Sequence, residues 1–162
     1  MTSLSFAEYG RVYLPIAIKP QDKNTMISIR FKVDTGADSS TISKHDLIDL
    51  GYDLAWIKTN AVVFEDDKRP TTASGAKIDA GYIQLPVINM LGYEGKYWPF
   101  QIILDESQNF GNLIGRDLLT GFNYWFNNDA DVFTIDRTKI FKPRYPFLSN
   151  QEINEISTIY EV

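Results

Sequence analysis

Hydrophobic residues alternate with other residues along two early segments of the chain, Val12 to Ile18 and Ile27 to Val33. A period of two is typical of strands with one buried face. The polar run at 20–24 between them has the composition of a turn, so the two segments predict a β-hairpin. Pro15 interrupts the first strand. It predicts a sheet edge or a bulge there, because proline cannot donate a backbone hydrogen bond to a neighbouring strand.

The next segment, Ser43 to Gly51, has the signals of one short helix. Ser43 is a favourable N-cap, Asp46 falls in the first turn where the helix dipole favours an acidic residue, and Gly51 supplies a stop. Leu47 and Leu50 would then face the core.

Strand patterns dominate the rest of the chain. We predict strands at 60–65 and 97–104, a long hairpin over 71–90 with its tip at 73–76, a helical turn at 116–120, and a hairpin formed by 122–126 and 132–135. Many short strands and few helices predict an all-β domain, with its sheet closed into a barrel. This domain would span 1–149. The tail 150–162 is expected to be helical, because Ile153, Ile156 and Tyr160 have helical spacing.

Composition narrows the classes of function. The 162 residues fit one domain with a sizeable core, and 44% hydrophobic and 14% aromatic residues indicate a globular protein. A net charge of -5 argues against nucleic acid or an anionic membrane as the main partner. The chain has no cysteine, which excludes disulfides, cysteine nucleophiles and cysteine metal sites. We expect no metal and no other cofactor.

The first residues and the length of the apolar stretches bear on the cellular compartment of the protein. The first residues lack a basic region followed by an apolar run, and no apolar stretch approaches the length needed to cross a membrane. A cytoplasmic protein without a membrane partner is therefore the expectation.

The main candidate for chemistry is the tripeptide Asp34-Thr35-Gly36, which follows the predicted strand 29–33. A strand here delivers an aspartate into a tight glycine turn, and small polar residues follow. The tripeptide alone could be an ordinary strand-end turn, because all three residue types suit turns. Far downstream, however, an apolar strand within the run 112–119 ends in Gly115-Arg116-Asp117.

These two motifs, in this order and at this separation, resemble the retropepsin family of retroviral proteases and their cellular and bacterial relatives. The resemblance covers roughly residues 26–136. It implies a retropepsin-like closed barrel (the acid-protease fold) with one or two short helices and a flap hairpin. It also implies an aspartic endopeptidase that acts on peptides or proteins as a homodimer.

The resemblance assigns roles to individual residues. Asp34 would be catalytic, with Thr35 locking the two subunits together at the dimer axis and Gly36 shaping the turn. Ala37 and Asp38 would border the substrate, and Arg116 after Gly115 would form an ion pair with Asp38 that holds the loop. The expected flap tip, which would cap the substrate, consists of Ser74, Gly75 and Ala76.

Peptide hydrolysis without a metal or a cysteine can use two neighbouring carboxylates that share one proton. The chain has a single Asp-Thr-Gly. Its nearest imitation, Asp79-Ala80-Gly81, lacks the Thr and is followed by the large Tyr82, so we interpret it as structural. The second carboxylate is therefore expected from Asp34 of another copy of the chain.

Three alternatives stay open at this point. The chain could be a catalytically inactive module of the same fold that serves dimerisation or peptide binding. A carbohydrate-active enzyme is disfavoured, because no second acidic motif accompanies Asp34. Calcium binding is disfavoured too, because the acidic residues do not follow the 12-residue loop pattern; they are Asp66, Asp67, Asp129 and Asp131.

Overall fold

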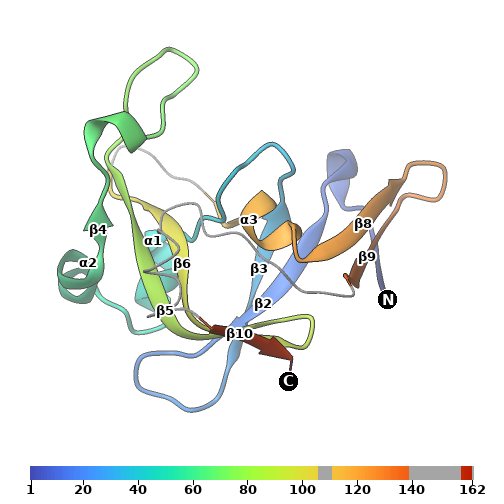
Figure 1. Ribbon diagram of the computed structural model, residues 1–162, viewed down its shortest axis with the longest axis horizontal. Helices are drawn as coiled ribbons and strands as arrows, with labels where there is room; N and C mark the ends of the chain where they lie inside the picture. The colour runs from blue at the N-terminus through green and yellow to red at the C-terminus, as the bar shows by residue number, and fades with distance from the viewer. Residues whose placement is uncertain (106–110, 139–157, 162) are drawn as a thin grey trace.

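The computed structural model describes residues 1–105, 111–138 and 158–161. Its strands form a three-stranded sheet in the order β1-β9-β8 and a seven-stranded sheet in the order β10-β6-β5-β2-β3-β7, with β4 paired to β5 beside this path (Figure 1). The strands are β1 (Thr2–Ser5), β2 (Tyr13–Ile18), β3 (Ile27–Val33), β4 (Val62–Val63), β5 (Ala80–Met90), β6 (Tyr93–Ile103), β7 (Leu113–Ile114), β8 (Phe122–Asn127), β9 (Val132–Arg137) and β10 (Thr158–Glu161). The helices are α1 (Lys44–Asp49), α2 (Leu54–Asn60) and α3 (Arg116–Leu119), with 3-10 turns η1 (Glu8–Gly10) and η2 (Asp66–Lys68).

The predicted hairpin of β2 and β3 is confirmed, with antiparallel pairing along the whole of β2. The alternation along β2 buries Leu14, Ile16 and Ile18 completely. Pro15 lies where β2 pairs with β3 alone, because β5 joins β2 only at the last two residues of β2. This part of β2 therefore has an open side, as the proline predicted.

Helix α1 also forms where the sequence placed it. Ser43 caps it by accepting a hydrogen bond from the Asp46 backbone N–H at 3.1 Å. Leu47 is fully buried, and Gly51 follows the helix with a φ of +90°, a conformation that favours glycine.

Helix α2 was not predicted. Its N-cap is Asp53, whose carboxylate accepts from the Trp56 N–H at 2.8 Å. Ile57 is buried, and the Trp56 ring lies 4.5 Å from the Tyr52 ring, centroid to centroid. An acidic cap followed by an apolar pair was the available signal. Because α2 continues to Asn60, the strand predicted over 60–65 shortens to β4.

The prediction of a long hairpin over 71–90 was wrong in its arms. The long hairpin is β5–β6, which turns at Leu91 and Gly92. These residues have φ values of +53° and +89°, the backbone of a tight two-residue hairpin turn. Residues 71–79 form an irregular loop before β5, whose one β-bridge among the described residues joins Thr71 and Lys77. The turn expected at 73–76 is present at the end of this loop.

The remaining predicted elements are present in β6, α3 and the β8–β9 hairpin. Strand β1 was not predicted; it pairs antiparallel with β9 and so completes the three-stranded sheet.

The prediction of a helical tail was wrong for the part of it that the structure describes. Residues Thr158–Glu161 form β10, antiparallel to the start of β6. Pairing with β6 satisfies the backbone groups of this segment, and β-branched and aromatic residues such as Thr158, Ile159 and Tyr160 favour a strand. Residues 150–157 and 162 of the predicted tail lie outside the described residues.

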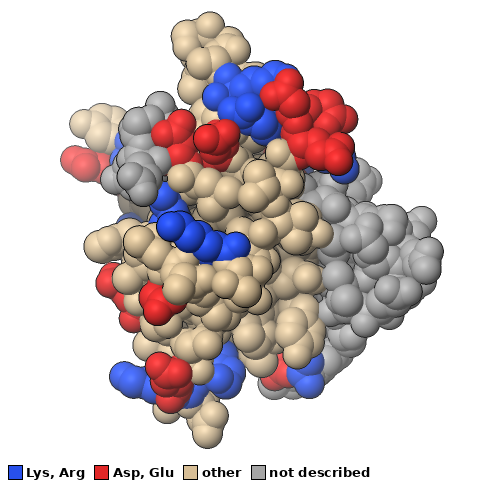
Figure 2. Space-filling model, turned by 90° about the vertical axis from the view of Figure 1, so that its left-hand side faces the viewer, with Lys and Arg blue, Asp and Glu red and all other residues tan. Residues whose placement is uncertain are grey.

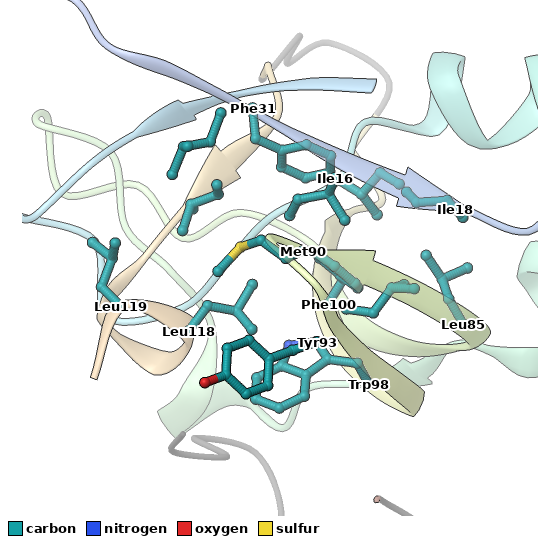
Figure 3. Packing of buried hydrophobic residues seen from close by; sticks show 14 of the residues in the cluster. Ile16, Ile18, Phe31, Leu85, Met90, Tyr93, Trp98, Phe100, Leu118 and Leu119 are labelled. Carbon is teal, nitrogen blue, oxygen red and sulfur yellow. The ribbon is translucent and has the colours of Figure 1, made fainter. Parts of the chain in front are cut away.

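One buried apolar cluster joins the two sheets and packs α1 and α3 against them. Figure 3 shows members of this cluster from the seven-stranded sheet and from α3. Trp98, Phe31 and Phe100 are among its largest fully buried members, and Phe133 and Ile135 bring β9 into the same core. Burial of such side chains contributes about 1.5–3 kcal/mol each to folding. In the described part of the chain, no helix has the length and apolar character that a membrane crossing requires.

The structure is mostly β with few helices. Closure of the sheet into a barrel stays a prediction. Thr41 forms single bridges to Gln101 of β6 and to Leu113 of β7, so one residue links strands that lie near opposite edges of the seven-stranded sheet.

Candidate active site

Strand β3 delivers Asp34 to the site. Its last residues pair in parallel with the short strand β7. The Asp34 N–H then donates to the Ile114 carbonyl at 2.9 Å, and the Lys32 N–H donates to the Asn112 carbonyl at 2.9 Å. Because β7 belongs to the downstream motif, the two halves of the motif pair are hydrogen-bonded directly to each other.

The turn after Asp34 is organised around its carboxylate. The Gly36 N–H donates to Asp34 Oδ1 at 3.0 Å, and the Ala37 N–H donates to the Asp34 carbonyl at 3.2 Å. A Cβ at Gly36 would lie 3.3 Å from Asp34 Oδ1, which is tighter than an ordinary contact. The Asp34 side chain is half-buried, whereas Thr35 and Gly36 are exposed. The carboxylate is thus oriented by the backbone of its own turn.

Backbone contacts from Gly115, Arg116 and Asp117 of the downstream motif hold this turn in place, and we call this arrangement the clamp. The Arg116 N–H donates to the Ala37 carbonyl at 2.8 Å, and the Asp117 N–H donates to the Asp38 carbonyl at 3.2 Å. Gly115 lies so close to the turn that an added Cβ would stand 2.7 Å from the Ser39 carbonyl carbon and oxygen. No side chain fits there, so glycine at 115 is required by close backbone approach.

Two buried polar side chains complete the clamp, and sequence reasoning missed both roles. Ser40 Oγ donates to Asp117 Oδ1 at 2.7 Å and accepts from the Gly115 N–H at 3.0 Å. Ser40 is 0% exposed and Asp117 1% exposed. In the described part of the chain, Asp117 Oδ2 has no hydrogen-bond partner. The available signal was an acidic residue directly before the apolar pair Leu118-Leu119.

Burial raises the pKa of the Asp117 carboxyl from its usual 3.8 to about 6, and the hydrogen bond from Ser40 acts in the opposite direction. Removing a carboxylate from water disfavours its charged form, which is why the burial effect is the larger one. The clamp therefore contains an acid that takes up a proton far more readily than an exposed aspartate does.

The ion pair between Arg116 and Asp38 is present, with Arg116 Nη2 3.2 Å from Asp38 Oδ1. The two side chains are 57% and 83% exposed, so this pair lies at the surface of the chain. Water screens such pairs strongly. In the single chain, the backbone contacts of the clamp hold the loop more firmly than the ion pair does.

The residues predicted as a flap tip lie at the end of the loop before β5. The Gly75 N–H donates to the Thr72 carbonyl at 2.9 Å, and the Thr72 N–H donates to the Ala76 carbonyl at 2.8 Å. Gly75 has a φ of +87°, and Ser74, Gly75 and Ala76 are all exposed. The turn itself is real, and its role as a flap stays a prediction.

Ion pairs brace the base of this loop. Arg69 contacts Asp66 at 3.1 Å and Asp79 at 3.0 Å, and Lys77 contacts Asp66 at 2.6 Å. The hydrogen bond and charge of Lys77 lower the pKa of Asp66. Asp79, the acidic residue of the segment Asp79-Ala80-Gly81, is thus bound by Arg69. Gly81 lies directly under β4, where an added Cβ would stand 3.0 Å from the Val62 carbonyl carbon. Both observations agree with the structural interpretation of that motif.

A cavity of about 630 Å³ separates the Asp34 turn from the loop before β5. Ala37, Asp38 and Ser39 line one wall, and the segment Pro70–Ala73 lines the opposite wall. Of the predicted substrate-binding residues, Ala37 and Asp38 therefore reach the cavity, whereas Ser74, Gly75 and Ala76 lie beyond it at the tip. Within the described residues, no group of three or more acidic or histidine side chains could hold a metal ion.

Comparison with solved structures places this fold. A retropepsin-like aspartic protease from Rickettsia conorii superimposes with a TM-score of 0.58 at 24% sequence identity, covering 83% of this chain and 97% of that chain. The retroviral protease-like domain of Ddi1 from Leishmania major gives a TM-score of 0.47 at 20% identity, covering 88% and 97%. No protein-family model matches the sequence, and no curated protein sequence matches it. The chain has a retropepsin-like fold, as its two motifs predicted.

We predict that Asp117→Asn removes a pH-dependent loss of stability. Because the folded-state pKa is raised, the proton on Asp117 favours the folded state; this contribution is complete below about pH 3.8 and is lost as the pH rises through about 6. The loss corresponds to about 3 kcal/mol. Urea unfolding of both proteins from pH 4 to pH 8 should show the free energy of unfolding of the variant rising relative to that of wild type across this window. A stability difference that does not change with pH would contradict the burial of an ionisable Asp117.

Arg116→Ala should cost about 1 kcal/mol of unfolding free energy or less, because the ion pair with Asp38 is exposed. The backbone hydrogen bond from residue 116 to Ala37 survives this substitution. Gly115→Ala is the matched contrast, since its new methyl group collides with the Ser39 carbonyl and should cost about 1–3 kcal/mol. Equal losses in the two variants, measured by thermal melts, would show that the surface ion pair matters as much as the clamp and would contradict this prediction.

Proposed function

We propose that this protein is an aspartic endopeptidase that hydrolyses peptide bonds with two Asp34 carboxylates, one from each subunit of a homodimer. The observation that supports this most is the placement of Asp34. Its carboxylate is held in a glycine turn at the end of β3, and Ala37 and Asp38, which follow that turn, line a cavity roofed by an exposed loop. The retropepsin-like fold of the chain supports the same reaction class.

In this mechanism the two carboxylates share one proton, because like charges a few ångströms apart do not both ionise. The ionised Asp34 takes a proton from a water molecule as the water oxygen attacks the carbon of the scissile carbonyl. The protonated Asp34 of the other subunit donates a hydrogen bond to the carbonyl oxygen. When the C–N bond breaks, the leaving amine takes a proton from the carboxyl pair.

The dimer is required by the count of carboxylates, since each chain has one Asp-Thr-Gly. Exposure of Thr35 and Gly36 leaves both open to a partner at a two-fold axis. Among the described strands, β8 pairs only with β9. Its residues Trp125 and Phe126 are 48% and 41% exposed, and β8 follows directly from the clamp helix α3 (Figure 1). A strand edge that no described strand covers, with exposed aromatic residues, suits contact with a second copy.

Asp34→Asn tests the reaction directly. Its side-chain oxygen can still accept the Gly36 N–H, so the turn and the fold should persist. Removing both ionisable groups of the pair should reduce cleavage by about 10²–10⁴-fold. We would digest a peptide pool across a range of pH with both proteins and identify the products by mass spectrometry.

Asp79→Asn is the matched control, because Asp79 belongs to the other Asp-x-Gly of the chain and is bound by Arg69. It should cleave like wild type. Undiminished cleavage by Asp34→Asn would refute the peptidase mechanism, and absence of cleavage by wild type at every pH would favour the inactive module.

A further inference from the structure

The cavity beside Asp34 has an apolar floor. Ile78 and Ile103 line it and are 3% and 7% exposed, so they form its buried end, and Thr41, 4% exposed, adds a methyl group and a hydroxyl to the lining. Leu113 of β7 adds a half-buried apolar side chain. A substrate side chain that reaches this end of the cavity would contact mainly hydrocarbon, which favours a residue with methylene groups over a short polar one.

The mouth of the cavity has a different chemistry. Its charged lining residues are Lys68, from the end of η2, and Asp38, from the Asp34 turn. Asp38 is already paired with Arg116 at 3.2 Å. Lys68 is exposed and forms no ion pair with any residue that the structure describes. Among the described lining residues, the cavity therefore has one charge without an ion-pair partner, and it is positive.

The other basic residues of the surrounding loop form ion pairs of their own, so among the described residues of this loop Lys68 is the basic one without an ion-pair partner. Its neighbours Arg69 and Lys77 are both bound to Asp66, and Arg69 also binds Asp79. Asp67 does not line the cavity. Figure 2 shows basic and acidic side chains lying side by side near the top of this face, where the loop before β5 projects. Among these basic residues, Lys68 alone lines the cavity.

We propose that Lys68 makes this cavity a subsite for an acidic side chain of the substrate, with glutamate preferred. Two methylene groups of a glutamate would contact the apolar floor, and its carboxylate would reach the Lys68 ammonium at the mouth. This inference rests on the proposed function for the cleaved bond, and it adds the substrate class. Ala37 and Asp38 line the cavity and directly follow the Asp34 motif, so the acidic residue would lie within a few positions of the scissile bond.

Glutamate and glutamine provide the sharpest comparison, because they differ in charge and hardly in shape. Exposed charge pairs contribute about 0.2–1 kcal/mol, which corresponds to a preference of about 1.4- to 5-fold for Glu over Gln. The preference should weaken with added salt, because the mouth is open to water.

The experiment has a cleavage arm and a binding arm. Wild type digests peptide pools in which one position near the cleaved bond is Glu, Gln or Lys. In parallel, Asp34→Asn, which cannot turn over substrate, is incubated with the same immobilised peptides and its retention is measured. We expect Glu to exceed Gln at one position in both arms, and Lys68→Glu, built into each background, to reverse the order so that Lys is favoured.

Lys58→Glu is the matched control, because Lys58 is exposed on α2, does not line the cavity, and gives the same change in net charge. It should leave the Glu preference intact. Equal use of Glu and Gln by wild type, or an unchanged Glu preference in Lys68→Glu, would overturn the proposal. If wild type cleaves nothing, the peptidase proposal fails, while the binding arm still decides for or against the acidic subsite.

Discussion

The site depends on the close approach of the Gly115 backbone to the turn that contains Asp34. Where a Cβ would stand 2.7 Å from the Ser39 carbonyl, only glycine allows the two segments to meet. That contact lets Ser40 receive the Gly115 N–H and donate to Asp117, and it aligns the Arg116 N–H with the Ala37 carbonyl. A glycine turn, a serine and a buried acid thus fix the direction in which Asp34 leaves its strand.

The clamp also connects the site to the core. Ser40 and Thr41 continue the turn into bridges with β6 and β7, while Leu118 and Leu119 of α3 are buried in the main apolar cluster. Loss of core packing would therefore be transmitted to Asp34 through one short helix. The loop before β5 is different: exposed ion pairs brace its base, and its tip has few buried contacts. Under the proposed function, a loop with so few buried contacts at its tip would move easily as a substrate enters.

Local patterns predicted the elements whose signals lie within a few residues. The alternation of β2 and the Ser43 cap belong to this kind. The sequence did not reveal that Leu91 and Gly92 would share left-handed backbone and move the long hairpin, or that pairing with β6 would make Thr158–Glu161 a strand. The second outcome depends on a partner strand distant in the chain, and the first was hidden because leucine rarely adopts left-handed backbone. Asp117 was overlooked because its role rests on burial and on Ser40, which lies 77 residues away.

The most direct test of the account is the activity of mixtures of wild type and Asp34→Asn at a fixed total concentration above the dimer dissociation constant, after the subunits have exchanged. If each site needs an Asp34 from both chains, activity follows the square of the wild-type fraction, so an equal mixture retains about a quarter of the wild-type activity. Activity in direct proportion to the wild-type fraction, with half retained in the equal mixture, would contradict a shared site and require a second carboxylate within one chain.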